Sequence, residues 1–451
     1  MTRIGVISLG CPKNRVDAEE ILGELCQAGY GIETDLRQAD VLIVNTCGFI
    51  QDAIDESMSA IHDAVRYKTN GACRSVIVTG CLAQRCGADL SVRLPKVDAI
   101  VGLGRSGELP VIISRTLAGE RVLDFSSRKH WWLDSRNRVL STPLWTAYLR
   151  IADGCDNRCT YCTIPSIRGS FRSRSEETIL EEAYGLAELG VKELILVAQD
   201  TTRFGLDTHG RLCLSDLIER LSAVDVHWIR LLYCYPNRVT DDLIHVIATN
   251  NKVCKYLDIP LQHCSERILA RMGRRGSRKE YVSLVSRIRE ECPGIALRTT
   301  LMVGFAGESD ADFEELLDFV REVRFDRLGA FIYSPEEGTP AAKLRRTVGY
   351  PEAKRRLDRL MTIQQQISLE KNRNLIGKRL EVLIESQGGN SCVGRSYRDA
   401  PEIDGIVRVL DCSASPGTFV QVEVTMAEEY DLIARPVKAQ SENKKPLEVT
   451  N

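Results

Sequence analysis

Short apolar segments alternate with amphipathic segments along most of this chain, and this alternation restricts the possible fold more than any other feature. In residues 1–118, the apolar segments RIGVISLG, ADVLIVN and SVIVTG are separated by helical patterns such as VDAEEILGELCQAG. Six further units of the same kind follow between residues 143 and 372. Strands that alternate with helices form parallel sheets with helices on their faces. The sequence therefore predicts α/β domains built on parallel sheets.

The second series of strands is too short for a closed barrel. Its apolar segments are AYLRIA, ELILVAQD, WIRLLYCYP, YLDIPLQ, ALRTTLMVG and LGAFIYS. About eight units would close a TIM barrel, so six predict an open, partial (βα)6 barrel. Residues 375–437 change to short strands (RLEVLIE, IVRVLD, FVQVEVT, LIARPV) broken by Gly, Asp and Ser, which predicts a small β-barrel. We expect an N-terminal domain at 1–118, a linker at 119–140, the partial barrel at 141–372, the β-barrel at 373–439 and a flexible tail at 440–451.

The composition is that of a globular protein without a global bias toward nucleic acid. Of its 451 residues 43% are apolar and 27% charged, and the net charge is −2. Apolar runs such as residues 41–44 are far shorter than the ~18 residues of a membrane span. The start MTRIGVISLGC resembles a lipoprotein leader, but its apolar stretch is shorter than the roughly 7–15 residues of a signal core. We therefore expect a cytoplasmic protein without a membrane partner, in which reduced cysteines serve as metal ligands, catalytic groups or core residues.

Three cysteines each follow a predicted strand of the N-terminal domain. They are Cys11, Cys47 and Cys81, at separations of 36 and 34 residues, which is one strand–helix unit per cysteine. Because the carboxyl ends of parallel strands form the binding edge of an open sheet, these thiols are expected to converge. The alternative is three unrelated buried cysteines, but structural cysteines favour strand interiors and cores over loops.

Three more cysteines follow the first strand of the partial barrel with the spacing Cys155-x3-Cys159-x2-Cys162. One interpretation is a zinc site completed by a distant Cys or His. However, structural zinc usually takes two closely spaced pairs of ligands, whereas no second pair follows here and the chain has only 6 His. The other is an iron–sulfur cluster held by three thiolates, which would leave one iron free to bind a small molecule.

The motif CxxxCxxC after the first strand of a partial barrel resembles the signature of radical S-adenosylmethionine (SAM) proteins, and Tyr161 fits the aromatic residue common before the third cysteine. The segments GCPKNRVDAE, NTCGFI and TGCLAQR are similar to the N-terminal domain of methylthiotransferases. IPSIRGSFRSR and FDRLGAFIYSPEEGTPA continue the agreement, and the C-terminal β-module resembles an OB-like TRAM domain. The chain is thus identified as a member of the radical SAM methylthiotransferase family.

This resemblance implies two 4Fe–4S clusters and SAM as cofactors. An auxiliary cluster would be held by Cys11, Cys47 and Cys81, and the radical SAM cluster by Cys155, Cys159 and Cys162. In the family, one SAM methylates a sulfur carried on the auxiliary cluster, and a second SAM is reductively split to a radical that removes the substrate hydrogen. The substrate radical then captures the methylthio group. An electron donor such as flavodoxin or ferredoxin is implied, no zinc is expected, and no catalytic side chain beyond the cluster ligands is indicated.

The resemblance also suggests contacts to SAM. Gln199 and Asp200 end the second barrel strand, where related proteins hold the SAM amino group, and Tyr161 lies within the cysteine motif. Arg298 and Gly304 belong to the fifth strand segment, RTTLMVGFAGE, which is similar to a segment that contacts SAM. The alternative for each is an ordinary polar or packing residue at the end of a strand.

The family has two branches, which differ in substrate. One, MiaB-like, thiolates a modified adenosine of transfer RNA, and the other thiolates the β-carbon of an aspartate in a small-subunit ribosomal protein (S-twelve). Residues 374–438 carry seven Lys or Arg against ten Asp or Glu, and this charge of −3 favours a basic ribosomal protein, free or within the assembled subunit, over RNA.

Two motifs, RDAPEIDGIV and GCPKN, also resemble the ribosomal-protein branch, which we therefore predict. The basic run RILARMGRRGSRK could contact RNA or form a solvated helix face and loop. A third, non-enzymatic hypothesis is an RNA-binding protein whose cysteines form structural zinc sites.

Overall fold

The computed structural model describes residues 1–126 and 138–437. The chain forms two compact units, Met1–Ile363 and Gln364–Asn451, with the boundary inside a long helix. The predicted tail at 440–451 and the middle of the predicted linker lie outside the described residues. Among the described residues, no helix combines the length and the apolar character needed to cross a membrane.

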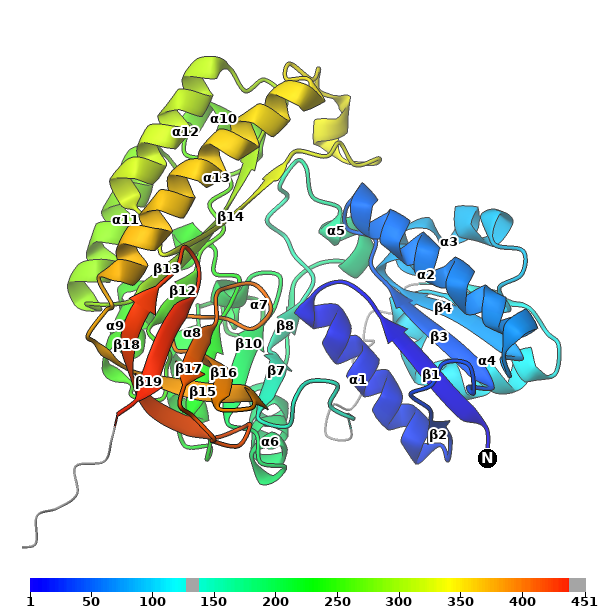
Figure 1. Ribbon diagram of the computed structural model, residues 1–451. Helices are drawn as coiled ribbons and strands as arrows, with labels where there is room; N and C mark the ends of the chain where they lie inside the picture. The colour runs from blue at the N-terminus through cyan, green and yellow to red at the C-terminus, as the bar shows by residue number, and fades with distance from the viewer. Residues whose placement is uncertain (127–137, 438–451) are drawn as a thin grey trace, which may run out of the picture. The chain divides into compact units, whose positions relative to one another are not determined.

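The first unit begins with a six-stranded, fully parallel sheet of order β2-β1-β3-β4-β5-β6 (Figure 1), which confirms the predicted parallel α/β domain. Its strands are β1 (Arg3–Ser8), β2 (Gly31–Ile32), β3 (Val41–Thr46), β4 (Ser75–Gly80), β5 (Ala99–Val101) and β6 (Val122–Asp124). Strand β6 lies where we expected a linker, so that expectation is wrong for residues 122–124. The buried side chain of Val122 and the pairing of Val122 with Ala99 make this short segment the edge of the sheet.

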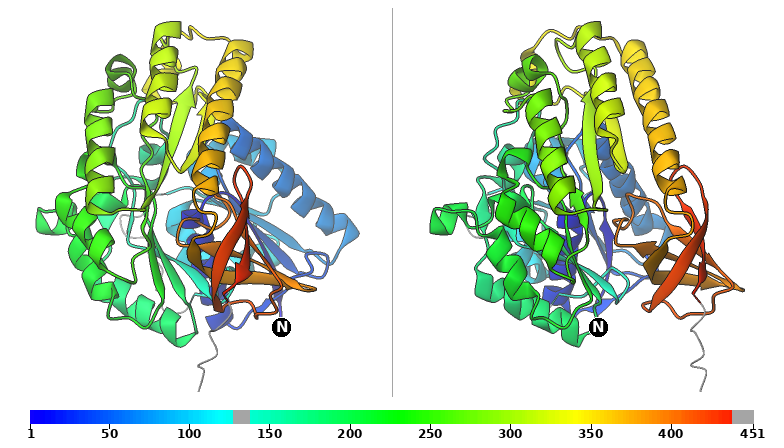
Figure 2. Two further views of the ribbon diagram at one scale, coloured as in Figure 1. Left: turned by 60° about the vertical axis from the view of Figure 1, so that its left-hand side comes forward. Right: turned by 90° about the vertical axis from the view of Figure 1, so that its left-hand side faces the viewer.

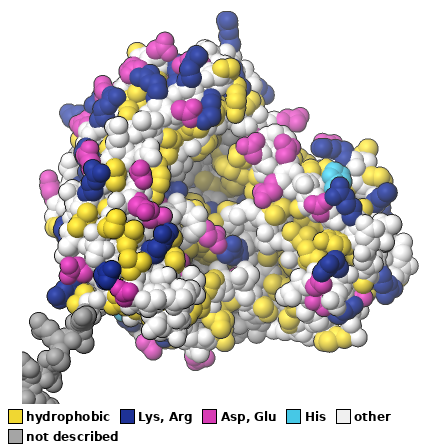
Figure 3. Space-filling view, in the orientation of Figure 1, with side chains coloured by type: hydrophobic (Ala, Val, Ile, Leu, Met, Phe, Trp, Pro, Cys, Tyr) yellow, Lys and Arg dark blue, Asp and Glu magenta, His cyan; other side chains and the backbone are white. Residues whose placement is uncertain are grey.

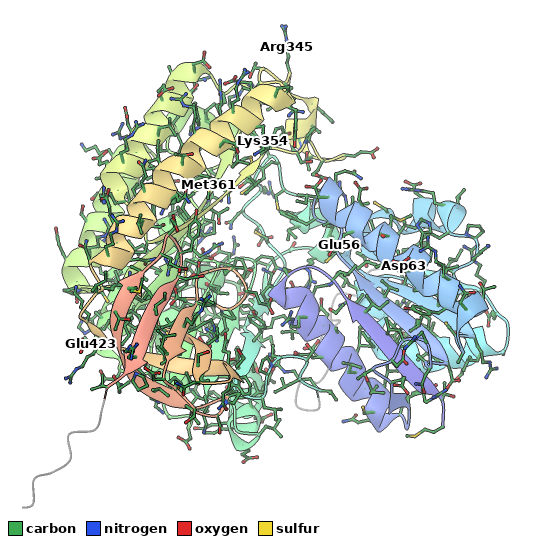
Figure 4. All side chains as sticks on the ribbon, viewed as in Figure 1. Glu56, Asp63, Arg345, Lys354, Met361 and Glu423 are labelled. Atoms are coloured by element: carbon green, nitrogen blue, oxygen red, sulfur yellow. The ribbon has the colours of Figure 1, made fainter. Side chains whose placement is uncertain are left out.

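Helices cover both faces of this sheet. They are α1 (Pro12–Gln27), α2 (Gln51–Asn70), α3 (Cys81–Arg93) and α4 (Leu109–Leu117). Because successive side chains of a strand point to opposite faces, Leu42 and Val44 pack in the cluster that includes α2 and α3, whereas Val41 and Ile43 pack with α1 and α4. Glu56 and Asp63 project from the exposed side of α2 (Figure 4).

The six predicted barrel strands are all present and parallel, which confirms the partial barrel (Figure 2). They form two three-stranded sheets of order β11-β10-β7 and β12-β13-β14. A single parallel bridge between Ile229 and Val253 connects the two groups. The strands are β7 (Thr146–Arg150), β10 (Glu193–Val197), β11 (Trp228–Leu231), β12 (Tyr256–Asp258), β13 (Ala296–Val303) and β14 (Arg327–Ile332).

The main barrel helices are α6 (Glu176–Glu188), α8 (Leu214–Leu221), α9 (Asp241–Thr249), α11 (Arg278–Glu291), α12 (Asp310–Val323) and α13 (Tyr350–Arg373). Four of them begin at a Ser or Thr whose side chain accepts a backbone N–H, namely Ser175, Thr240, Ser277 and Ser309. Shorter elements at the strand ends are β8 (Ala152–Asp153), α5 (Ile164–Arg168), β9 (Arg172–Ser173), α7 (Leu206–His209) and α10 (Glu266–Arg271). Short 3₁₀ helices are η1 (Leu103–Glu108), η3 (Thr201–Arg203), η4 (Pro236–Arg238) and η5 (Pro340–Lys343).

The second unit contains a closed five-stranded barrel of order β15-β16-β17-β19-β18, as expected for the C-terminal module. Its strands are β15 (Arg379–Gly388), β16 (Ser391–Ser396), β17 (Val407–Leu410), β18 (Phe419–Ala427) and β19 (Leu432–Pro436). Alternating inward residues such as Val382, Ile384, Val422 and Val424 fill the interior. Strand β16 was not among the four predicted strands.

Candidate active site

Both cysteine triplets line one cavity of the first unit. The cavity has a volume of about 770 Å³, and its wall includes Cys11, Cys47 and Cys81 together with Cys155, Cys159 and Cys162. Figure 3 shows a hollow with hydrophobic side chains on this unit. The volume lies within the roughly 300–1,000 Å³ of small-molecule and cofactor sites. The structure thus places all six cysteines predicted as cluster ligands on the wall of a single cavity.

Glycines allow the three thiols of the N-terminal domain to approach one another. Gly10, with φ +93°, precedes Cys11, and a Cβ atom at Gly10 would lie 2.8 Å from the Cβ of Cys47. Gly80, with φ +97°, precedes Cys81, and its Cβ would lie 2.5 Å from the carbonyl oxygen of Thr46. Real Cβ atoms essentially never make contacts this short, so a side chain at either position would push the cysteine-bearing loops apart.

We predict that Gly10→Ala prevents assembly of one iron–sulfur cluster, because the added methyl group displaces Cys47. Reconstituted protein should lose about half of its iron, as measured by iron and acid-labile sulfide analysis. Gly29→Ala is the matched control, since Gly29 also has a positive φ (+84°) but nothing lies within 4 Å of its Cβ position. Both variants carry the cost of about 1–2 kcal/mol for a left-handed alanine. Equal iron in the two variants would contradict the prediction.

Arg168 joins the two cysteine motifs. It belongs to α5, the short helix directly after Cys162, and its Nη2 lies 3.5 Å from the Sγ of Cys81. The same guanidinium donates to Asp17 of α1 (2.6 Å) and to Asp153 at the start of the Cys155 loop (3.0 Å). Arg168 is buried, so these contacts fix the Cys155 loop against the N-terminal domain.

Positive charge surrounds the thiols of the N-terminal domain. Burial alone would raise the pKa of Cys11, but Lys13 and Arg168 outweigh it, and the pKa lies below the ordinary value. For Cys81 burial dominates and raises the pKa to about 12, although Arg168 opposes it. Metal-bound cysteine is a thiolate, so nearby cations favour the form that an iron–sulfur cluster needs.

Backbone hydrogen bonds hold the CxxxCxxC loop from two sides. The amide of Cys155 donates to the carbonyl of Gly169 (3.0 Å), and the amide of Thr160 donates to the carbonyl of Met272 (2.9 Å).

Burial raises the pKa of two thiols in this loop, to about 11 for Cys155 and to about 12 for Cys162. Cys155 and Cys162 are therefore protonated at neutral pH until a metal displaces the protons.

Tyr161, one of the predicted cofactor contacts, lies on the cavity wall. Its ring meets that of Phe305 edge-on at 6.3 Å between centroids, and Phe305 in turn packs on Tyr333 at 4.8 Å. These rings belong to a buried cluster formed by the ends of β13 and β14 and by α10. The aromatic residue of the motif thus anchors the cysteine loop to the barrel.

Several buried polar atoms on the cavity wall have no hydrogen-bond partner among the described residues. They are Gln199 Oε1, Gln262 Oε1, Arg274 Nε and Tyr333 OH. The amide nitrogen of Gln199 donates to Asp153 (2.6 Å), whereas its buried oxygen has no partner among the described residues. Unsatisfied polar atoms in an otherwise apolar wall are typical of a binding site.

The donors therefore fit the implied cofactors: two sets of three thiols for clusters, and separate polar atoms for SAM. A site for a single metal ion is a different arrangement. In residues 1–126 and 138–437, no group of three His, Cys, Asp or Glu side chains is close enough to share one ion.

Asp200, in contrast to its neighbour Gln199, is not part of the cavity wall as far as the structure describes it. Its carboxylate accepts from Asn157 of the CxxxCxxC loop (2.9 Å) and from Arg238 (2.7 Å). Asp200 is buried, so it supports the cysteine loop from behind.

Arg298 and Gly304 also lie outside the described cavity wall. Arg298 donates to Asp258 (2.9 Å), and the amide of Gly304 donates to Glu308 (2.9 Å). Of the five predicted cofactor contacts, the structure brings Tyr161 and Gln199 to the cavity and gives the other three roles in the surrounding framework.

Three cavity residues escaped the sequence analysis: Lys13, Arg168 and Arg274. Each lies in a segment quoted for another reason (GCPKN, IPSIRG and RMGRRG), so their positions beside glycine- and cysteine-containing motifs were the available signal. Arg274 is only 7% exposed, and its Nη1 lies 3.8 Å from the Sγ of Cys159. Because Arg274 is buried, neither of the two interpretations of the basic run RILARMGRRGSRK, an RNA contact or a solvated helix face and loop, applies to it.

Three family models match the chain. The Radical SAM superfamily matches residues 149–320, the Uncharacterized protein family UPF0004 residues 3–102, and the TRAM domain residues 376–437.

Curated relatives match over nearly the whole length. "Ribosomal protein uS12 methylthiotransferase RimO" of Pelotomaculum thermopropionicum is 49% identical over 440 residues, covering 96% of this chain and 99% of the relative. The protein of the same name from Desulforudis audaxviator is 48% identical and covers 96% and 97%.

Among solved structures, the radical S-adenosylmethionine methyltransferase TsrM from Kitasatospora setae, with cobalamin and a [4Fe-4S] cluster bound, superimposes with a TM-score of 0.55. The alignment covers 87% of this chain and 77% of TsrM at 14% identity. At this identity the likeness concerns the fold alone.

Proposed function

Because this chain belongs to the family of ribosomal protein uS12 methylthiotransferases named RimO, we propose that it adds a methylthio group to the β-carbon of an aspartate in small-subunit ribosomal protein S-twelve. The predicted radical SAM family is confirmed, and with it SAM and 4Fe–4S clusters as the cofactors of the family. The names of the relatives favour the ribosomal-protein branch over the transfer RNA branch. The single observation that carries the proposal is that both cysteine triplets line the same cavity.

We assign the auxiliary cluster to Cys11, Cys47 and Cys81 and the radical SAM cluster to Cys155, Cys159 and Cys162. When bound, SAM and the clusters supply the methyl group, the sulfur chemistry and the radical chemistry that no side chain can perform. The protein's part is to hold these groups around one enclosed space and to exclude water from it. The apolar wall, with residues such as Met302 and Phe331, serves the second purpose.

Charged residues on the wall adjust the two cluster sites. Arg168 beside Cys81 and Arg274 beside Cys159 place one guanidinium at each triplet. A cation at this distance stabilises thiolate over thiol and lowers the negative charge that the buried site must carry. Arg168 additionally sets the position of one triplet relative to the other, through Asp17 and Asp153.

For the remaining predicted site residues we propose two kinds of role. Gln199 and Tyr161, which lie on the wall, contact SAM directly. Asp200 positions the cysteine loop through Asn157, and Arg298 orients Asp258 at the neighbouring strand end. Gly304 provides a left-handed turn (φ +71°) after β13.

We further propose that flavodoxin or ferredoxin supplies the electrons and that the enzyme works in the cytoplasm, where ribosomal proteins are made and assembled. These proposals rest on the family and on the substrate. Reduction of the reconstituted protein by purified flavodoxin or ferredoxin, followed as bleaching of the cluster absorbance, tests the first of them.

The experiment that tests the function is mass spectrometry of ribosomal proteins and of transfer RNA nucleosides from cells that lack this protein. A single methylthio group on an aspartate of S-twelve should disappear and return when the protein is expressed again. Expression of Cys159→Ala should not restore it. Loss of a methylthioadenosine with unchanged S-twelve would overturn the proposal in favour of a transfer RNA substrate.

A further inference from the structure

Lys13 places a buried ammonium group on the wall of the cavity. It is the second residue of α1, directly after the Cys11–Pro12 step, and only 7% of it is exposed. Its Nζ lies 3.4 Å from the centroid of the Tyr233 ring. A lysine over an aromatic face is held by cation–π attraction, which grows in strength as the pair loses water.

The ring beneath Lys13 is itself fixed. Tyr233 has a left-handed backbone (φ 62°), and its amide donates to Asp258 at 3.0 Å. Asp258 is held in turn by Arg298, at 2.9 Å. The ammonium of Lys13 therefore lies over a platform that the barrel strands position, although Lys13 itself comes from the N-terminal domain.

No carboxylate of the described chain forms an ion pair with Lys13. The other cation close to Cys11, Arg168, already has Asp17 and Asp153. Of the acids on the cavity wall, Glu336 is paired with Arg85 at 3.0 Å, and Asp52 lies in the first turn of α2. Apart from the neighbouring thiol of Cys11, Lys13 thus has the face of an aromatic ring beside it and no carboxylate. A buried ammonium group gains from an anionic partner, so a carboxylate that enters this cavity is stabilised by approaching Lys13.

We propose that Lys13 binds the carboxylate of the aspartate that is modified, an inference that rests on the proposed function. In that reaction the carbon that receives sulfur is bonded directly to the carboxylate carbon. Fixing the carboxylate at Lys13 thus fixes the reacting carbon within about one bond length, in a cavity lined by both cysteine triplets. An uncharged nucleobase offers no such anion, so Lys13 also selects for the acidic substrate.

The alternative is that Lys13 only balances the charge of the auxiliary cluster through its neighbour Cys11. The two roles differ in what they affect. A substrate-binding lysine determines the affinity for aspartate relative to asparagine and leaves the empty holoenzyme unchanged. A charge-balancing lysine alters the midpoint potential of the auxiliary cluster and affects the two substrates equally.

The test compares holoenzymes of the wild type, Lys13→Met and Lys13→Arg, with Lys354→Met as control. Lys354 lies on α13, outside the cavity wall, with a half-exposed side chain paired with Asp358 (Figure 4). The probes are purified unmodified S-twelve and the same protein with the target aspartate replaced by asparagine. Their dissociation constants are measured anaerobically without SAM, so that no turnover occurs, and cluster potentials are measured by redox titration with electron paramagnetic resonance.

The wild type and Lys354→Met should bind the aspartate form about tenfold to a hundredfold more tightly than the asparagine form, the range expected for a charged hydrogen bond. Lys13→Met should bind both forms alike, at the affinity of the wild type for the asparagine form, and Lys13→Arg should keep part of the preference. Full iron content in each variant shows that the site is assembled.

A wild-type preference that survives in Lys13→Met overturns the inference, as does a wild type without any preference. If the cluster potential shifts while the preference survives, the charge-balancing role is correct instead. The proposed function is judged separately, because it fails only if the wild type leaves S-twelve unmodified in cells.

Discussion

Replacing either Cys81 or Cys159 by alanine is expected to reduce methylthiolation of S-twelve below detection while one cluster stays in place. Each thiol supplies one of only three proposed ligands of its cluster, and the other two thiols of the same triplet are already ligands. Each variant should therefore keep about half of the iron, and the two should lose different electron paramagnetic resonance signals.

The control is Cys26→Ala, since Cys26 is an exposed thiol near the end of α1 and takes no part in the cavity wall. It should keep full iron and full activity. Normal methylthiolation by Cys81→Ala would show that the N-terminal triplet has no part in the reaction. Stoichiometric zinc in place of iron would instead support the hypothesis that the cysteines form structural zinc sites.

The sequence predicts most of the fold because the pattern of each long strand is local. Strands such as β3 and β10 are continuous apolar segments followed by polar residues, and such segments can be recognised without knowledge of their partners. The missed strands are short or mixed in polarity. Strand β16 reads SCVGRS, and β6 has only three residues, so both depend on pairing with segments that no local pattern identifies.

The meeting of six cysteines could be predicted because strand ends converge in a parallel sheet, whatever the details of packing. Individual side chains could not be assigned in this way. Gln199 and Asp200 are adjacent, but neighbouring residues at a strand end point in different directions, and only Gln199 reaches the cavity. On β13, Thr300 and Met302 line the cavity, whereas Arg298, two residues earlier on the same face, lies outside the described cavity wall.

Side-chain contacts between distant parts of the sequence are the feature of the site that is hardest to predict. Arg168 and Cys81 are 87 residues apart, and Arg150 and Asp17 are separated by 133. For an arginine within a strand or after a cysteine motif, no local sequence feature indicates which residue will be its partner. The charges could be counted from the sequence, but the pairing required the fold.

Arg150→Met is expected to lower the free energy of unfolding of the first unit by about 3–5 kcal/mol, the cost of removing one partner from a buried ion pair. Arg150 ends β7 and is 1% exposed. It donates to both oxygens of Glu20 at 2.6 Å and also contacts Asp17, so it ties the first barrel strand to α1. Chemical denaturation followed by circular dichroism measures the loss.

The expected loss depends on pH. Burial raises the pKa of Glu20 to about 7, above its usual 4.5, with Arg150 acting in the opposite direction. The folded protein therefore binds more protons than the unfolded chain between about pH 4.5 and 7, and the contribution of Glu20 to stability falls as the pH rises through this range. Without Arg150 this carboxyl holds its proton still more firmly. The variant should consequently lose most stability above pH 7 and less near pH 5.

Two further variants separate the charge effect from loss of packing. Adding Glu20→Gln to Arg150→Met removes the unpaired carboxylate and should restore part of the stability, mainly above pH 7. Arg220→Met breaks an exposed pair with Glu176 and should cost no more than about 1 kcal/mol. If Arg150→Met costs as little as Arg220→Met, the buried network does not hold α1 to the barrel. The coupling of the two cysteine triplets would then depend on other contacts, such as those of Arg168.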